Sequence, residues 1–412
     1  MDNVTNFLEK NADGWEVFKT KEHLKVLKIE NNKIKSVNEG LDEGYAVRVI
    51  VNGKVGFASG NDLMEISKNA VKIARISEEK LEEFAFSKHK KAEGIYDKGF
   101  EESDDWLLNS AEIVLNTISE FGCIANSTIE AGKSEIRIMN SSGLDCNETS
   151  TSFGGLVEVV KEDSSSYEIQ ESRKMDVDFE WITKKAAKLT LEGLKAAKLD
   201  KGIYDVVLSP IAVHQLLFFA LYPAFSAENF LKGRSQLKIG DKIGEITIVD
   251  DGKLDNALFT SSFDYEGVDT KKTVVVDKGE FKSFLTDFKY SKELDVEMTG
   301  NCYRDELNSY PAIAPTNVVL EFEDKLDWEG DRVLEVHAFI GSHTSNPVSG
   351  DFSLECMNAV LVDKDRIPIK TAMIYGNVYE FLKKIEGFGK DVRQFENTIT
   401  PSILFRAVVV SG

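Results

Sequence analysis

The chain has 412 residues, enough to bury a large core, and its 42% hydrophobic and 29% charged residues are typical of a globular protein. A formal net charge of −20 argues against direct binding of nucleic acid, because that affinity comes largely from clustered lysines and arginines. No basic and apolar leader opens the chain, no apolar run approaches a membrane span, and the four cysteines form no close pair. We therefore expect a cytoplasmic protein with free thiols.

The first half of the chain combines strand patterns with helix patterns. Residues 44–60 contain two alternating apolar runs around Asn52 and Gly53, which predicts a hairpin with a two-residue turn. Asn61 or Asp62 then precedes apolar residues at helical spacing, as a helix cap does. We expect helices over 4–11, 62–77, 103–121 and 179–197, and strands over 15–20, 23–32, 33–40, 44–60 and within 128–171.

An apolar helix opens the second half. Pro210 suits the first helical position, and the following residues up to Phe225 leave almost no polar face, which predicts a helix buried on all sides. His214 is its single histidine, whereas a zinc peptidase helix needs two histidines one turn apart and a glutamate. The helix therefore offers no evident metal site.

Short strand patterns separated by turns fill the rest of the chain, with one further helix expected over residues 377–386. The polar stretch near residue 200 predicts a boundary between two domains. We expect an α+β protein with two domains, an N-terminal domain of hairpins and helices over 1–200 and a mainly antiparallel β domain over 201–412 that holds the apolar helix.

Several stretches, in this order, carry a resemblance: GYAVRVIVNGKVGFASGND, FLKGRSQLKIGDKI, FDYEG, MTGN, PTNVV, GDFS, IYGNVYEFLKKIEGFGKD, and TPSILF leading to VVSG. Together the chain resembles the TldD/PmbA family, long labelled modulators of DNA gyrase and understood as a two-subunit zinc peptidase system. The resemblance spans nearly the whole chain. It implies a two-domain α+β protein that pairs with a related chain and degrades or matures peptides inside the cell.

The same resemblance separates two kinds of member. The catalytic kind, TldD, carries an HExxxH helix and a zinc-binding cysteine near the C-terminus. Counted back from the shared KGxS motif, the histidine positions fall on Phe218 and Pro223 and the glutamate position on Phe219. None of these side chains binds a metal or activates water, and no cysteine follows near the C-terminus. The chain thus resembles the PmbA (TldE) kind, with zinc expected only in a catalytic partner.

Other candidate sites remain open. His337, His343, Glu355 and Cys356 fall in a short interval and have zinc-type donors, although nothing in the sequence sets them at ligand spacing. Asp264 and Glu266, one residue apart on an expected extended segment, would point to one side and could do acid–base work or hold a loop at the domain interface. Arg234 could bind the C-terminus of a substrate or form an internal salt bridge.

Three functions follow. The first is a non-catalytic subunit that assembles with a metal-bearing homologue and helps to hold an unfolded peptide, for which Arg234, Asp264 and Glu266 are groove candidates. In that case a glutamate at Phe219 would bury an unpaired carboxylate and destabilise the fold. The second is an independent enzyme, such as a metallopeptidase, with an unrecognised site: either the cluster of His337, His343 and Cys356 or the paired carboxylates of Asp264 and Glu266. The third is a homodimeric binding protein for peptides or for a regulatory target.

Overall fold

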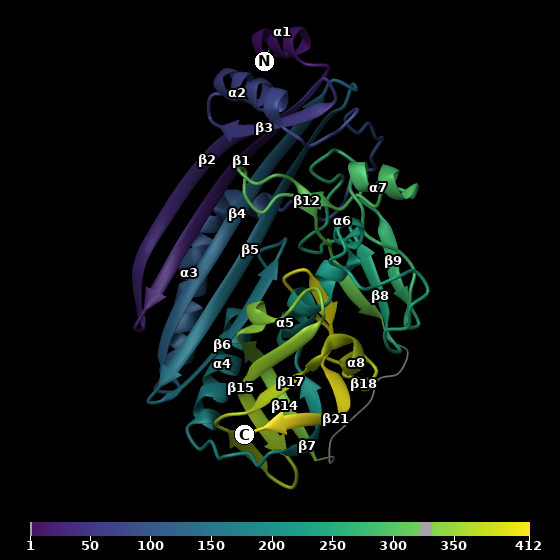
Figure 1. Ribbon diagram of the computed structural model, residues 1–412. Helices are drawn as coiled ribbons and strands as arrows, with labels where there is room; N and C mark the ends of the chain where they lie inside the picture. Colours follow the sequence, from purple (N-terminus) through teal and green to yellow (C-terminus); the bar gives the residue numbers. More distant parts are fainter. Residues whose placement is uncertain (1, 322–331) are drawn as a thin grey trace.

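The computed structural model describes residues 2–321 and 332–412 of the protein. In this part of the chain, a long sheet with helices on one face stands against a region that contains three further sheets, one of them two-stranded (Figure 1). Helices and strands are mixed throughout, so the predicted α+β class is confirmed. No helix among the described residues combines the length and the apolarity needed to cross a bilayer.

Residues 14–172 carry a six-stranded sheet with the strand order β3-β2-β1-β4-β5-β6, in which all neighbours are antiparallel. Its strands are β1 (Gly14–Glu30), β2 (Lys33–Val51), β3 (Lys54–Gly60), β4 (Ile124–Asn140), β5 (Asp145–Lys161) and β6 (Ser164–Ser172). The strands expected over 15–20 and 23–32 are one strand, because Lys21 and Glu22 pair without interruption with β2. The hairpin turn at Asn52 and Gly53 is confirmed, with φ of 53° and 73°.

Helices cover one face of this sheet. Val17 and Val47 pack against α1 and α2, while Leu27 and Val157 pack against α3 and α4. The helices are α1 (Asp2–Asn11), α2 (Leu63–Ile76), α3 (Ser103–Ser119) and α4 (Phe179–Gly193), with the short helix η1 (Lys98–Glu102) before α3. The opposite face carries Phe18, which packs with side chains of the second half of the chain.

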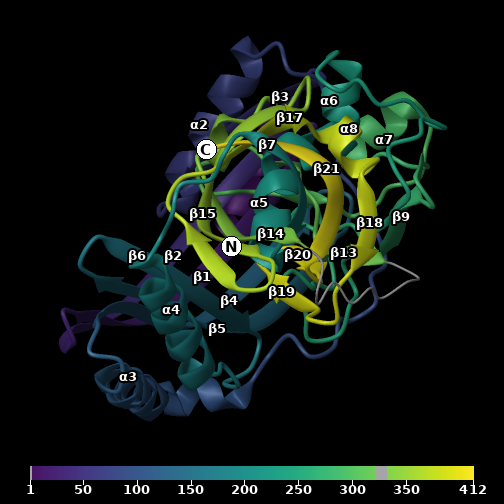
Figure 2. The ribbon, with the colours of Figure 1, turned by 90° about the horizontal axis from the view of Figure 1, so that it is seen from below.

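The second half is built of short strands around a large core. One sheet has the order β14-β7-β21-β17-β15-β16, and a further pairing of β14 with β15 closes five of these strands into a ring. Its strands are β7 (Gly202–Leu208), β14 (Val333–Ile340), β15 (Asp351–Val362), β16 (Arg366–Ile369), β17 (Met373–Asn377) and β21 (Ile403–Ser411), and β18 (Ile385–Phe388) pairs with β21. Figure 2 looks along the ring and shows α5 (Pro210–Ala220) within its outline.

The other sheet of this half has the order β10-β9-β8-β13-β20-β19, and a two-stranded sheet joins β11 and β12. These strands are β8 (Thr247–Asp251), β9 (Lys272–Asp277), β10 (Glu280–Phe281), β11 (Cys302–Tyr303), β12 (Ala312–Ile313), β13 (Val318–Glu321), β19 (Arg393–Phe395) and β20 (Thr398–Thr400). The remaining helices are η2 (Tyr222–Phe225), α6 (Ala227–Leu231), α7 (Phe288–Leu294), η3 (Ser342–Thr344) and α8 (Val378–Leu382).

Two expectations about helices need correction. The helix expected over 377–386 is the five-residue α8, and the following residues join β18 because they pair with β21. The apolar helix is also shorter than expected. It ends at Ala220, and η2 follows with Pro223 at its start, because a proline lacks the N–H that would continue the helical hydrogen bonds.

Candidate functional site

The first candidate site is α5, the helix that the family resemblance places at the metal-site position. Ser209 caps its N-terminus by accepting a hydrogen bond from the N–H of Ala212 at 3.3 Å, and Pro210 occupies the first turn as predicted. The Ser209 hydroxyl also donates to the carbonyl of His337 on β14. The start of α5 is therefore tied to the strand beside it.

The expectation that α5 is buried on all sides is wrong. Gln215, Phe218 and Phe219 are only half-buried, whereas the neighbouring side chains on the helix are buried. Gln215 uses its polar group to join the two halves of the chain: Oε1 accepts from the N–H of Phe339 at 2.6 Å, and Nε2 donates to the hydroxyl of Tyr167 at 3.2 Å. Because Phe219 is half-buried, a glutamate there would cost less than burial of a full charge.

His214 is the single histidine of α5, and its ring is held by its neighbours. Nδ1 lies 2.9 Å from the hydroxyl of Thr398, and Nε2 lies 3.2 Å from a carboxylate oxygen of Glu396. The ring stacks on Phe218 with centroids 5.1 Å apart. The hydrogen bond from His214 lowers the pKa of Glu396. Both ring nitrogens thus have partners within the chain.

These residues do not fit a zinc ion. Phe218 and Phe219 present rings, Pro223 has no side-chain donor, and His214 alone supplies one imidazole on α5. Among the described residues, the one group of three metal-ligand side chains with all ligand atoms within 4.8 Å lies elsewhere and contains no residue of α5. The chain therefore lacks the chemistry of a zinc peptidase on this helix.

The structure does not bring together the alternative cluster of His337, His343 and Cys356. His337 is buried on β14, where Nε2 lies 2.9 Å from the carbonyl of Tyr167, and burial lowers its pKa. His343 is exposed in η3. No group of ligand atoms within 4.8 Å that includes any of the three occurs in residues 2–321 and 332–412.

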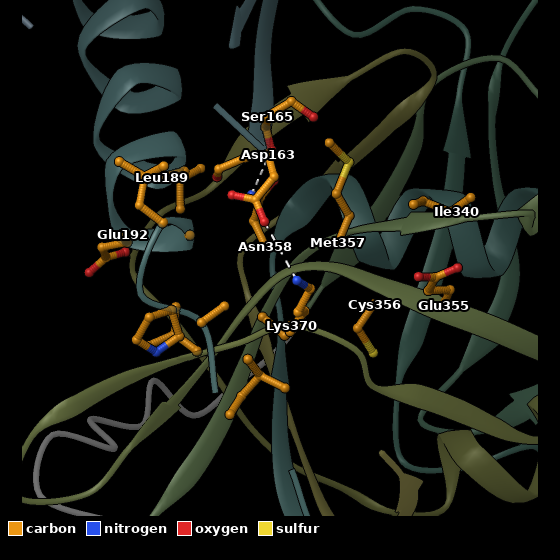
Figure 3. Close-up of a pocket in the computed structure, with 18 residues that line it drawn as sticks. Asp163, Ser165, Leu189, Glu192, Ile340, Glu355, Cys356, Met357, Asn358 and Lys370 are labelled. Carbon is orange, nitrogen blue, oxygen red and sulfur yellow. Dashed lines mark hydrogen bonds and ion pairs between the residues drawn. The ribbon is translucent and has the colours of Figure 1, made fainter. Parts of the chain in front are cut away.

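Cys356 lies at a pocket of about 330 Å³ between α4, β6, β15 and β16 (Figure 3). Burial raises the pKa of its thiol to about 12, so the thiol is neutral at physiological pH. Two contacts span the pocket: Lys370 pairs with Asp163 at 3.5 Å, and Asn358 donates to the carbonyl of Ser165 at 3.0 Å. These two contacts join β15 and β16 to the start of β6 across the pocket.

Asp264 and Glu266 do not lie on an extended segment, as the sequence suggested, but at the start and in the middle of a turn. Asp264 is fully buried, and its carboxylate accepts hydrogen bonds from the N–H groups of Glu266, Val268 and Cys302. The turn closes because a side-chain oxygen can replace a backbone acceptor. Asp264 therefore holds the loop.

Glu266 points away from that turn toward the first sheet. Its Oε1 accepts from Nη1 of Arg48 on β2 at 2.8 Å, and its Oε2 accepts from the N–H of Phe288 at 3.0 Å. Arg48 is 2% exposed and also pairs with Glu16 on β1 at 2.7 Å. A buried ion network thus joins the two halves of the chain, and neither Asp264 nor Glu266 presents a free carboxylate to a peptide.

Asp287 and Cys302 lie close to Glu266. The three ligand atoms are within 4.8 Å of one another, and all three side chains are buried. Burial and the neighbouring Glu266 raise the pKa of Asp287 to about 7. Burial, together with the nearby carboxylates, raises the pKa of the Cys302 thiol well above its usual range. Sequence reasoning missed this cluster, because its members are far apart along the chain and no local spacing joins them.

Arg234 is exposed in the loop after α6, and in the described part of the chain its guanidinium forms no ion pair. Its backbone N–H donates to the carbonyl of Asn229 at 2.7 Å. The salt bridge considered for it is therefore not formed among these residues. The groove role of Arg234 stays a prediction.

Three models of one known protein family match successive parts of the chain. Models of the PmbA/TldA metallopeptidase family match the chain in order, domain 1 over residues 15–74, the central domain over 79–194 and the C-terminal domain over 201–412. The chain belongs to the PmbA/TldD family. The first two PmbA/TldD models share the six-stranded sheet, which spans β1–β3 and β4–β6. The two-domain division at residue 200 stays our proposal.

Related proteins align with this chain over most of its length. An uncharacterized protein of Methanocaldococcus jannaschii is 35% identical over 98% of this chain and 98% of its own length. A metalloprotease of Methanothermobacter thermautotrophicus is 24% identical over 89% of this chain and 85% of its own. The crystal structure of TldE from Thermococcus kodakarensis has a TM-score of 0.93 at 24% identity and covers all of both chains, which shows the shared fold.

Proposed function

We propose that this chain is a TldE-type subunit of a two-subunit metallopeptidase, without a catalytic zinc site of its own. It would assemble in the cytoplasm with a TldD-type homologue that supplies the zinc, and the pair would degrade or mature unfolded peptides. The observation that supports this most directly is α5: the positions of the family's metal-site helix carry Phe218, Phe219 and Pro223, and His214 is already bonded to Thr398 and Glu396.

The half-buried face of α5 supports the same proposal. Phe218 and Phe219 present aromatic surface near the end of the helix, where a partner subunit or a peptide would cover it. A scaffold that no longer binds zinc has no need for polar ligands on this face. Aromatic rings there would instead contribute buried area on assembly, since such rings dominate the energetics of interfaces.

The test is peptidase activity on an unfolded peptide, measured for this chain alone, for a TldD-type homologue carrying HExxxH alone, and for the mixture. We expect no activity from this chain alone and strong activity in the mixture. Activity of the isolated chain that is lost on chelation would refute the proposal and favour an independent metallopeptidase.

A variant of α5 and a matched control test whether this helix contacts the partner subunit or the peptide. The double substitution Phe218→Ser and Phe219→Ser is expected to weaken complex formation and lower activity in the mixture by at least about tenfold. Phe86→Ser, at a side chain 55% exposed in the segment between α2 and η1, is the control and should change neither. If the double variant assembles and acts normally, α5 does not face the partner or the peptide.

The other function that we carry forward is a homodimeric binding protein for peptides or a regulatory target. Stable binding of peptide by this chain alone, with no gain of activity on adding the homologue, would favour it. Sedimentation of the isolated chain and of the mixture distinguishes a homodimer from a mixed complex.

A further inference from the structure

The buried cluster of Glu266, Asp287 and Cys302 lies where the first sheet meets the loops of the second half, and none of its members is on α5. Their exposed fractions are 4%, 8% and 0%. Because one carboxylate oxygen from each acid and the sulfur all lie within 4.8 Å of one another, small shifts would bring them to the roughly 2.0–2.3 Å that zinc requires.

The charges around the cluster do not balance. Four carboxylates are buried here, those of Glu16, Asp264, Glu266 and Asp287, against two guanidinium groups: Arg48 pairs with Glu16 and Glu266, and Arg304 lies near the same two acids. Among the described residues Asp287 forms no ion pair. Unpaired buried charge is costly, so the site must take up protons or a cation.

The Cys302 thiol points at these carboxylates and has no hydrogen-bond partner in residues 2–321 and 332–412. Its backbone is fixed on both sides: the N–H donates to Asp264 at 3.0 Å, and the carbonyl accepts from the N–H of Tyr265 at 2.7 Å. Without a cation, a fully buried thiol beside two acids stays protonated, and a cation bound there would favour its deprotonation. As a thiolate it is a strong ligand for a soft cation.

The two carboxylates are oriented by groups behind them. Arg48 and the N–H of Phe288 each donate to one oxygen of Glu266, and the N–H of Tyr290 donates to Oδ1 of Asp287 at 2.7 Å. Metal ligands are commonly held by such outer hydrogen bonds. Glu266 and Asp287 also line a cavity of about 320 Å³, which offers an entry path and room for water.

We propose that Glu266, Asp287 and Cys302 bind one divalent ion of the zinc type, with a water molecule as the fourth ligand. A sulfur donor beside two oxygens favours zinc over magnesium or calcium. Binding releases the thiol proton to solvent and involves no change of oxidation state. The ion would fasten the turn at Glu266, the start of α7 and β11 to one another, next to the contact of Glu266 with Arg48.

This site is structural and independent of the proposed peptidase partnership, so each can fail without the other. The experiment uses the full chain, treated with a chelator and titrated with Co²⁺. We expect one equivalent to produce a thiolate-to-cobalt charge-transfer absorption, which Zn²⁺ abolishes by displacement. Absence of this absorption at stoichiometric Co²⁺ would overturn the proposal.

Variants assign the ligands. Cys302→Ser should abolish the absorption, whereas Cys356→Ser, which changes another buried cysteine outside the cluster, should keep it. Asp287→Asn retains an oxygen that can cap α7 and should weaken Co²⁺ binding by about tenfold or more. An absorption that persists in Cys302→Ser would also overturn the proposal.

Because a variant could fail to fold, the site is also tested by the melting temperature of the wild-type chain. Zn²⁺ should raise the melting temperature of the chelator-treated protein, since an ion that binds only the folded state stabilises it. Mg²⁺ at the same concentration should not. An equal shift with both ions would contradict a site with a sulfur ligand.

Discussion

At the scale of single residues, the chain buries several carboxylates and gives each a different environment. Asp264 accepts three backbone N–H groups, and Glu266 has Arg48 as its counter-ion. Asp250 on β8 has neither arrangement: it accepts from the amide of Asn301 and from the N–H and hydroxyl of Thr316, all of them neutral. Neutral donors compensate only part of the cost of burying a charge.

The buried carboxyl group of Asp250 should make the free energy of unfolding depend on pH. Burial raises its pKa to about 6 from an ordinary 3.8, so the folded state binds more protons than the unfolded state between these values. Its contribution to stability is full below the unfolded pKa and is lost as the pH rises toward 6. Replacing Asp250 by Asn should remove this term, roughly 3 kcal/mol.

The measurement is the free energy of unfolding by urea at pH 4 to 8, for the wild type, Asp250→Asn and the exposed control Asp255→Asn. The free energy of unfolding of the control should change with pH as that of the wild type does. If Asp250→Asn retains the full pH dependence between pH 4 and 6, another group is responsible for it.

At the scale of secondary-structure elements, close packing depends on small residues at particular places. Gly56 on β3 lies directly beneath α2. A Cβ built there would come within 2.0 Å of the carbonyl oxygen of Ala70 and 2.4 Å of the N–H nitrogen of Ala74. Both atoms belong to the helix backbone, so a side chain cannot be accommodated by a rotamer change. The helix must move away from the sheet.

Gly56→Ala is therefore expected to destabilise the protein by about 3 kcal/mol, the upper part of the range for overpacked cores. Gly40→Ala on β2 is the matched control, because a Cβ added there would have no atom within 4 Å. Its effect should stay within about 0.5 kcal/mol. Urea unfolding of both variants checks the difference, and equal stabilities would contradict direct contact of α2 with β3.

At the scale of the whole molecule, the two halves share a buried interface. Phe18 and Ile138 of the first sheet pack with Phe263, which is 1% exposed and belongs to the second half. The pair of Arg48 and Glu266 crosses the same junction, and Arg393 pairs with Glu168 at another point. We therefore expect the halves to unfold together.

Phe263→Ala tests this coupling, with an expected loss of about 3–5 kcal/mol. Three of the four tryptophans, Trp15, Trp106 and Trp181, lie in the first half, so their fluorescence reports on the half that does not contain the substituted residue. The fluorescence transition and the circular-dichroism transition should shift together to lower urea. A fluorescence midpoint that stays unchanged would show that the halves unfold independently.

The sequence alone determined the class of fold, the start of the apolar helix at Pro210 and the hairpin at Asn52 and Gly53, because these depend on local spacing and on the conformations of a few residues. It also determined the absence of zinc ligands at Phe218, Phe219 and Pro223, since a missing donor atom needs no structure to recognise. Asn31 and Asn32, with φ of 50° and 61°, form a turn where the pattern predicts the end of a strand, because the surrounding charges obscure the alternation.

Only the tertiary structure decided which side chains meet. Arg48 comes from the first sheet, Glu266 from a turn, Asp287 from the cap of α7 and Cys302 from β11, and nothing local in the chain predicts their approach. The half-buried face of α5 is likewise a property of its surroundings, because hydrophobicity states what a helix would bury but not what covers it. Contacts distant in sequence are set by the packing of whole elements, and that information is not local.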